Sequence, residues 1–270
     1  MAMPNNLVLV RHAESEGNLA VALSKKGDHS AYEGPFKSRH SSQWRLSDEG
    51  VRQATVTGKW IAKHLKLRFD RFYASEYLRA METAALLDIP DASWFTEFYL
   101  RERSWGSLDR ASVAEREVRF KESMEERAID PFYWTPPNGE SMAELCIRID
   151  RVINTLHREC DGKNVIIVCH GEVMWAFRVR LERMAQETFH LLDASKNPLH
   201  RIHNCQVIHY TRINPHETGS SPTPYLNWVR SVCPWKPKLS NSIWSPINRL
   251  RYNNRELLDR VERVKPLILK

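Results

Sequence analysis

The chain has 270 residues, 42% of them hydrophobic and 27% charged, which is enough to bury a sizeable core in one domain with additions. No apolar run approaches the ~20 residues of a membrane-spanning helix, and the first residues, MAMPNN, lead into a predicted strand without the apolar core of a signal peptide. We therefore expect a cytoplasmic protein with no membrane partner. Its formal charge of +7 comes from 40 basic and 33 acidic residues that alternate without a long basic run, which favours small anionic ligands and disfavours nucleic acid.

The first half of the chain alternates short apolar segments with helical periodicities. Residues 7–10, LVLV, predict a buried strand because they are branched and apolar on both faces. A helix is predicted over 15–23, and the polar residues 24–46 are expected to form a long loop or flap. Ser47 is predicted to cap a helix that ends near residue 67. A strand is expected next at 71–75. A helix capped by Ser75 follows it, and another strand is expected at 93–98.

The second half of the chain continues this alternation. The charge-rich residues 112–128 predict one helix, and a longer helix follows the turn TPPNGES at 135–141. A second clearly buried strand, NVIIVC, leads to a helix that ends near residue 184, and a last strand is expected over 205–211. Strands that alternate with helices predict an α/β fold: a three-layer α/β/α sandwich with a mostly parallel central sheet.

The composition changes near residue 214 to Pro, Ser, Asn and Trp. We therefore divide the chain into a catalytic domain, 1–213, and a C-terminal extension, 214–270. The extension is too aromatic for a solvated linker, so we expect it to pack on the domain and to end in a helix near 253–264. The sequence leaves the choice between a monomer and a homodimer open.

Arginine or histidine side chains occur at or after the ends of three of the predicted strands. His12 comes after Arg11 at the end of the first strand, His170 precedes Gly171 at the end of another, and Arg79 lies in the first turns of a helix after a third. Ligands of α/β sheets bind beyond the carboxyl ends of the strands, where helix N-termini add a positive dipole end. Two arginines, two histidines and helix N-termini predict a pocket for a phosphoryl group.

Six segments together resemble the histidine phosphatase superfamily, the phosphoglycerate-mutase-like fold. They occur in the family's order and span roughly residues 7–211. They are RHAESEGN at 11–18, LSDEGVRQA at 46–54, SEYLRAMETA at 75–84, LRERSWG at 100–106, GES at 139–141 and VCHG at 168–171. The one clear departure is Ala13, where the family usually has Gly.

The resemblance implies a two-step mechanism with no metal and no cofactor. His12 attacks phosphorus and becomes phosphohistidine, while Arg11, Arg79 and His170 bind the phosphoryl oxygens. Glu102 protonates the leaving oxygen and then serves as the base for water. The implied partner is a small anionic phosphorylated substrate. The remaining candidates for phosphate or substrate contacts are Ser15, Asn18, Gly171, Glu172 and Arg45.

Each of these residues also has a structural explanation when taken alone. Arg79 could pair with a glutamate of its own helix, and Glu102 could belong to a solvated charge cluster. The two His-x-Glu triplets that begin at His12 and His170 could instead hold zinc or manganese. Two arginines beside a dication would be repelled, so a metal-dependent phosphoesterase is disfavoured.

The resemblance covers phosphatases, phosphomutases and proteins that have lost catalysis. Mutases of the family have a basic insertion after the catalytic glutamate and an HGNS turn. Here the turn is HGEV, with Glu172 in the place of Asn, and no consecutive basic residues follow Glu102. We therefore favour hydrolysis over transfer. A catalytically idle binding protein is the remaining alternative, and it is disfavoured because every catalytic position is filled.

Overall fold

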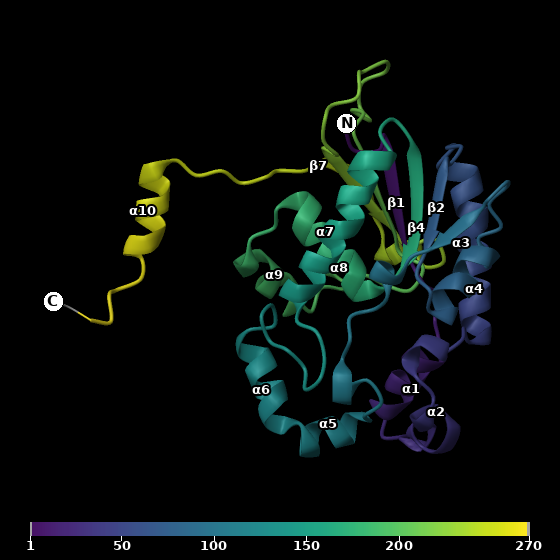
Figure 1. Cartoon of the computed structure of the whole chain (residues 1–270), viewed down its shortest axis with the longest axis vertical. Coiled ribbons are helices and arrows are strands. Elements are labelled where there is room, and N and C mark those ends of the chain that lie inside the picture. The colour runs from purple at the N-terminus through teal and green to yellow at the C-terminus, as the bar shows by residue number, and fades with distance from the viewer. Residues whose placement is uncertain (1, 269–270) are drawn as a thin grey trace.

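A seven-stranded mixed sheet forms the centre of the molecule (Figure 1), which is seen here in a computed structural model that describes residues 2–268. Four neighbouring strands are parallel to one another. Each of the other three is antiparallel to the strand that precedes it in the spatial order of the sheet. The predicted α/β class is confirmed, and the strands Val207–Thr211 (β5) and Asn241–Pro246 (β7) run against the rest. In spatial order the strands are β3 (Trp94–Thr96), β2 (Arg71–Ala74), β4 (Asn164–Cys169), β1 (Asn6–Arg11), β5 (Val207–Thr211), β6 (Trp228–Val232) and β7 (Asn241–Pro246).

Helices cover both faces of the sheet, which confirms the three-layer sandwich. Helices α7 (Met142–Glu159) and α8 (Gly171–Glu182) pack on one face, and α3 (Asp48–His64) and α4 (Leu78–Leu86) on the other. Along β1, Leu7 and Leu9 join the core under α7 and α8, whereas Val8 and Val10 join the core under α3 and α4. Successive side chains of a strand point to opposite faces, so a strand buried on both faces is apolar throughout.

A group of short helices lies beyond the carboxyl end of β1 (Figure 1). It consists of α1 (Glu16–Ser24), α2 (Gly34–Ser38), α5 (Val113–Arg119) and α6 (Lys121–Ile129). The predicted loop 24–46 thus contains α2, together with single helical turns at Ser30–Tyr32 and Ser41–Gln43. Lys37 of α2 forms an ion pair of 2.9 Å with Glu115 of α5. The prediction of one helix over 112–128 is wrong, because the backbone leaves the helical region at Phe120 (φ −124°) and separates α5 from α6.

Helix caps show how local sequence fixes the element boundaries. Ser47 caps α3 as predicted, with its hydroxyl accepting a hydrogen bond from the backbone N–H of Gly50. The prediction that Ser75 caps the next helix is wrong: α4 begins later, with Tyr77 in the cap position. The Ser75 hydroxyl is instead hydrogen-bonded to the ring of His170.

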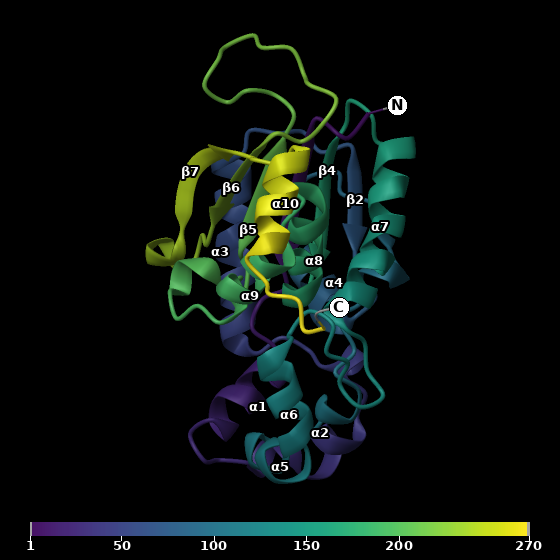
Figure 2. The same cartoon turned by 90° about the vertical axis from the view of Figure 1, so that its left-hand side faces the viewer.

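The C-terminal extension contributes to the sheet and then leaves it. Strands β6 and β7 extend the sheet from β5, so residues 228–246 pack on the domain. Helix α10 (Asn254–Glu262) stands apart from the body on an extended segment, and Figure 2 shows it in front of α8. Arg260 of α10 reaches Glu187 of α9 (Gln186–Asp193), a helix that the sequence did not predict, at 3.0 Å. Within residues 2–268, no helix is both long and apolar enough to cross a membrane.

Candidate active site

The register of the sheet places the two predicted histidines side by side. Strands β1 and β4 are parallel neighbours in which Arg11 pairs with Cys169, so His12 and His170 follow at the same level. Their ring centroids are 5.1 Å apart. His12 is 2% exposed and His170 is fully buried. Two strands that lie far apart in the sequence therefore bring their carboxyl ends to one site.

The environment of His12 leaves one ring nitrogen free as a nucleophile. Its Nδ1 lies 2.7 Å from the carbonyl oxygen of Ala13, which can only accept, so Nδ1 carries the proton. Nε2 then holds the lone pair, and it accepts a hydrogen bond of 3.2 Å from Nε of Arg79. Burial, followed by the charges of Arg79 and Arg11, lowers the pKa of His12 well below its usual value. The imidazole is therefore neutral near pH 7, as nucleophilic attack requires.

Two buried guanidinium groups supply the positive charge of the pocket. Arg79, near the start of α4, is 5% exposed and also donates to the carbonyl of Ser41 at 2.6 Å. Arg11 donates to the carbonyl of Ile202 at 2.7 Å, while its buried Nε has no hydrogen-bond partner among the described residues. Burial lowers the pKa of both side chains, but arginine remains charged in proteins. The pair suits an anion that carries several oxygens.

The orientation of His170 also leaves a polar atom for an anion. Its Nε2 lies 2.8 Å from the Ser75 hydroxyl, and its buried Nδ1 has no partner in the described part of the chain. If the hydroxyl donates to Nε2, Nδ1 carries the proton and can donate to a phosphoryl oxygen. Burial and the neighbouring arginines lower the pKa of His170 well below its usual value. Sequence reasoning assigned Ser75 to a helix cap and missed this role.

Glu102 faces the histidines from the segment that follows the helical turn Phe98–Leu100. One carboxylate oxygen accepts a hydrogen bond of 3.0 Å from the backbone N–H of Arg103. Burial, and after it the nearby Glu172, raises the pKa of Glu102 to about 7, against the opposing effect of Arg79. A carboxyl group with this pKa exchanges a proton easily at neutral pH, as a general acid and base must.

The remaining residues predicted to contact phosphate or substrate differ in what their side chains bond to and in which cavity they line. Ser15 and Asn18 line the same cavity as His12, but their side chains bond each other in the capping box of α1. Gly171 begins α8, and a Cβ there would lie 3.3 Å from Nε of Arg11, so glycine leaves room for that side chain.

Glu172 and Arg45 differ in where the structure places them. Glu172 lines a cavity with Arg11 and Glu102 and forms an ion pair with Arg103. Arg45 is exposed and pairs with Glu82 at 2.6 Å. It lines neither of the two cavities that include Arg11 and Glu102.

The departure at residue 13 leaves the loop geometry intact. Ala13 is fully buried, and its φ is not positive, so an L-residue fits there without strain. Its backbone N–H donates to the hydroxyl of Thr83 on α4 at 3.0 Å. A glycine is required instead at residue 50, where a Cβ would lie 2.0 Å from the carbonyl oxygen of Glu14. This contact packs the start of α3 against the catalytic loop.

Two cavities are lined by residues of this candidate site. One, of about 180 Å³, is bounded by His12 and Arg79 and by the aromatic rings of Tyr32, Trp44 and Trp105. The other, of about 750 Å³, leads from Arg11 and Glu102 past basic side chains, among them Lys25, Arg127 and Arg201. These cavities provide room for a small organic leaving group and for water.

The same centre contains three atoms that could ligate a metal ion. The ligand atoms of His12, Glu102 and His170 lie within 4.8 Å of one another. The guanidinium groups of Arg11 and Arg79 lie in the same pocket, and Arg79 already donates a hydrogen bond to the unprotonated ring nitrogen, Nε2, of His12. The two His-x-Glu triplets do not form a common ligand set, because the carboxylate of Glu14 accepts a hydrogen bond of 2.7 Å from Ser47. The charges therefore suit an anion better than a dication.

Comparison with known proteins gives one family for most of the chain. Residues 7–212 match the histidine phosphatase superfamily (branch 1). The human 6-phosphofructo-2-kinase/fructose-2,6-bisphosphatase 3 is 26% identical over 253 residues, which are 93% of this chain and 42% of the human protein. The corresponding enzyme of Aquarana catesbeiana is 29% identical over 199 residues, 74% of this chain and 37% of that protein. The chain thus spans less than half the length of these curated relatives.

Solved structures share the fold at lower identity. The alpha-ribazole phosphatase of Shigella flexneri is 20% identical with a TM-score of 0.58, and the match covers 82% of this chain and 96% of that one. The mycobacterial glucosyl-3-phosphoglycerate phosphatase is 18% identical with a TM-score of 0.59, over 76% and 92% of the two chains. These similarities establish the sandwich architecture.

Proposed function

Because the chain belongs to the histidine phosphatase superfamily (branch 1), we propose that it hydrolyses a small phosphomonoester through a phosphohistidine intermediate, without a metal ion. The observation that carries this proposal is the state of His12. Its Nδ1–H donates to the carbonyl oxygen of Ala13, and its Nε2, which holds the lone pair, accepts a hydrogen bond from Arg79. The ring of a second, neutral histidine, His170, lies 5.1 Å away. A buried, neutral imidazole among cationic donors is suited to attack on a phosphoryl group.

In the first step, Nε2 of His12 attacks phosphorus and the bond from phosphorus to the leaving oxygen breaks. Protonated Glu102 gives its proton to that oxygen, so the leaving group departs as an alcohol. Arg11, Arg79 and His170 donate hydrogen bonds to the phosphoryl oxygens. The carbonyl of Ala13 stabilises the positive charge that develops on the ring through its bond to Nδ1.

In the second step, the carboxylate of Glu102 takes a proton from water. The resulting hydroxide attacks phosphorus, the bond from phosphorus to Nε2 breaks, and His12 returns to its neutral state with release of inorganic phosphate. Both steps use the same carboxyl group in opposite protonation states. A pKa of about 7 allows both states to be populated near neutral pH.

Two features support hydrolysis as the outcome. The larger cavity gives water a path to Glu102. The carboxylate of Glu172, which lines this cavity, would repel a second phosphate group of a transfer intermediate. The size of the cavities supports a small phosphorylated metabolite as the substrate.

The test is hydrolysis of 4-nitrophenyl phosphate in excess EDTA by the wild type and by His12→Ala. We expect turnover that resists the chelator and is lost in the variant, together with acid-labile ³²P on the wild type alone after rapid quenching. Phosphate release that is abolished by EDTA would overturn the metal-independent mechanism. Turnover that survives in His12→Ala would overturn the role of the nucleophile. A wild type inactive on this substrate and on a panel of small phosphomonoesters would overturn the proposed function.

A further inference from the structure

A second carboxylate, Glu172, lines the same cavity as Glu102, to which the proposed function assigns the role of general acid. Glu172 is in the first turn of α8, two residues after His170, and its side chain is 27% exposed. Both carboxylates line the larger cavity. The N-terminal end of a helix favours an acidic side chain at this position.

Arg103 connects the two carboxylates. Its Nη1 lies 3.6 Å from Glu172, and its backbone N–H donates to Glu102 at 3.0 Å. The Arg103 side chain is 2% exposed, and its other donors reach the carbonyls of Glu140 at 2.7 Å and Trp134 at 3.2 Å. The guanidinium also lies 5.5 Å from the ring centres of Trp105 and Trp134. These contacts fix the position of the guanidinium group, so a movement of the Glu172 side chain would break their ion pair.

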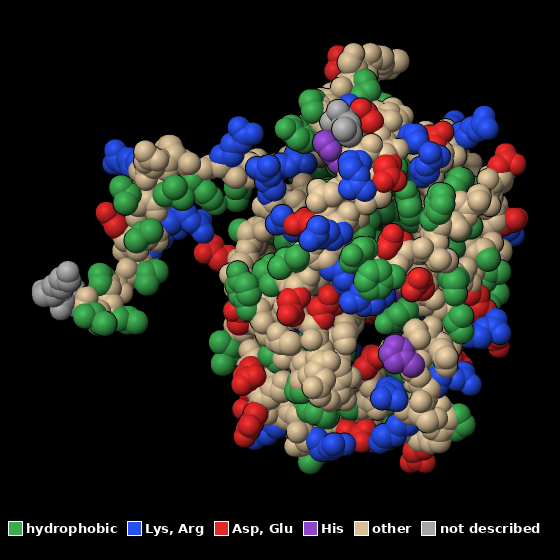
Figure 3. Space-filling model, viewed as in Figure 1, with side chains coloured by type: hydrophobic (Ala, Val, Ile, Leu, Met, Phe, Trp, Pro, Cys, Tyr) green, Lys and Arg blue, Asp and Glu red, His purple; other side chains and the backbone are tan. Residues whose placement is uncertain are grey.

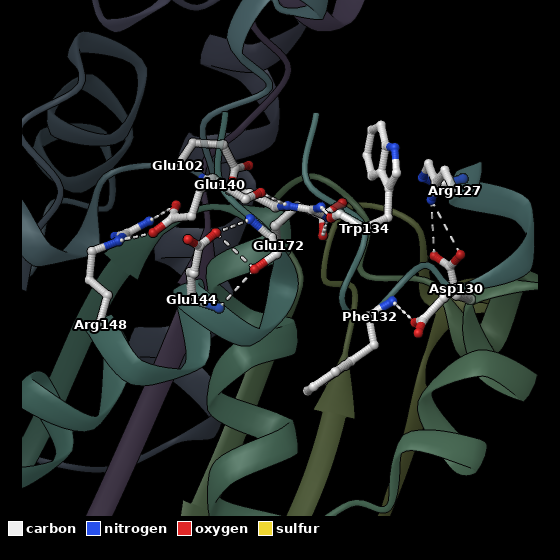
Figure 4. Close-up of polar contacts among 12 residues, drawn as sticks. Glu102, Arg127, Asp130, Phe132, Trp134, Glu140, Glu144, Arg148 and Glu172 are labelled. Atoms are coloured by element: carbon white, nitrogen blue, oxygen red, sulfur yellow. Dashed lines mark hydrogen bonds and ion pairs between the residues drawn. The ribbon is translucent and has the colours of Figure 1, made fainter. Parts of the chain in front are cut away.

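We propose that Glu172, fixed by the buried Arg103, is a positioning residue that holds Glu102 in its acid form until the leaving group departs. This inference rests on the proposed function. Figure 4 shows Glu102, Glu140 and Glu172 together in this region. Glu172 itself touches neither phosphorus nor the leaving oxygen in this scheme.

The other charges around Glu102 act in the opposite direction. Arg11 at the end of β1 and Arg79 on α4 both lower its pKa, as does the hydrogen bond from the backbone of Arg103. His12 and His170 are neutral and contribute little charge. Burial and Glu172 are the two influences that raise the pKa. Removal of Glu172 leaves two guanidinium groups opposed by burial alone.

The test follows the titration of Glu102 directly. ¹³C NMR of protein labelled at the glutamate side-chain carboxyl carbon gives its midpoint, and the signal is assigned by its loss in Glu102→Gln. We expect a midpoint near 7 in the wild type and a fall of about one unit in Glu172→Gln, since a neighbouring like charge shifts a pKa by this order. Glu172→Asp, which keeps the charge, should restore most of the shift.

Asp193→Asn provides the matched control, because Asp193 lines the same cavity but pairs with Arg127 at 3.2 Å. Its midpoint should equal that of the wild type. The pH limit of phosphohistidine formation, measured by rapid quench, should move with the NMR midpoint in Glu172→Gln. A midpoint that does not fall in Glu172→Gln, or that falls equally in Asp193→Asn, would overturn this inference alone. A wild type that forms no phosphohistidine would instead overturn the proposed function, and the inference with it.

Discussion

The buried ion pair between Arg148 and Glu140 anchors the segment that carries Glu102. Arg148, on α7, donates from Nε and Nη2 to the two carboxylate oxygens of Glu140, each at 2.8 Å (Figure 4). Its Nη1 donates to the carbonyls of Tyr99 and Arg101, immediately before Glu102. The side chains of Arg148 and Glu140 are 7% and 14% exposed. Replacement of Arg148 by methionine therefore leaves a buried carboxylate and two carbonyls without donors.

Breaking a buried ion pair by removal of one partner costs about 3–5 kcal/mol of unfolding free energy. For a domain of this size, that corresponds to a fall in Tm of roughly 6–12 °C. We expect this loss in Arg148→Met, measured by urea unfolding and by calorimetry, together with a lower kcat because Glu102 loses its support. Arg151→Met on the exposed side of the same helix is the control and should stay within about 0.5 kcal/mol of the wild type.

The double variant Arg148→Met/Glu140→Met separates the pair from its parts. Because the buried carboxylate is then also removed, we expect it to regain more than half of the stability lost in the single variant. A loss of less than about 1 kcal/mol in the single variant would contradict this prediction, since the ion pair could not then anchor the segment.

Three further outcomes are expected from the structure. Arg79→Lys should lower kcat by about 10²–10³ with little change in Tm, because the lysine ammonium cannot bond both His12 and Ser41. An unchanged kcat would contradict the proposed role of Arg79 in binding the phosphoryl group. Gly50→Ala should destabilise the fold by about 1–3 kcal/mol in urea, because its Cβ would lie 2.0 Å from a backbone oxygen, and a neutral result would show that the loop can yield. Phosphohistidine formation should fall tenfold per pH unit above about 7, as Glu102 loses its proton, and Glu102→Gln should be slow and independent of pH over this range.

The histidine pair was predictable from sequence because it depends on strand order alone. Two apolar, branched segments that each end in a histidine predict parallel strands whose carboxyl ends meet at one edge. The observed register, Arg11 opposite Cys169, required only that these strands be neighbours. The positions of Arg11 and Arg79 followed from the same reasoning, since each lies at the end of a strand or the start of a helix at that edge.

The position of Glu102 was not derivable from local pattern. The residues that hold its segment, Arg148 and Glu140, follow it by about 40 residues in the chain, and only the resemblance to a family singled it out. Arg103, which connects it to Glu172, sits in a charge-rich stretch that predicts a solvated surface. Buried arginines that bond backbone carbonyls have no periodicity, so sequence reasoning misses them.

The C-terminal strands show a second limit. Strand β7, NSIWSP, is an edge strand with Ile243 exposed and a proline at its end, so it lacks the alternation of a half-buried strand. On the face shown in Figure 3, basic and acidic side chains are interspersed, and hydrophobic side chains of α10 are exposed. Composition alone predicted that the extension packs on the domain, but it could not show that the sheet continues through it.

Burial is the influence that prepares both reacting groups at once. It disfavours the charged form of any side chain, so it keeps His12 neutral and raises the protonated fraction of Glu102, and it is the largest cause of both pKa shifts. Arg11 and Arg79 lower the pKa of both groups, because positive charge favours the deprotonated form of each, so they favour a neutral histidine but oppose a protonated Glu102. A phosphate pocket of this charge therefore needs a further negative group on the side of the acid. Glu172 lies in the first turn of the helix that follows His170, where it forms an ion pair with the buried Arg103.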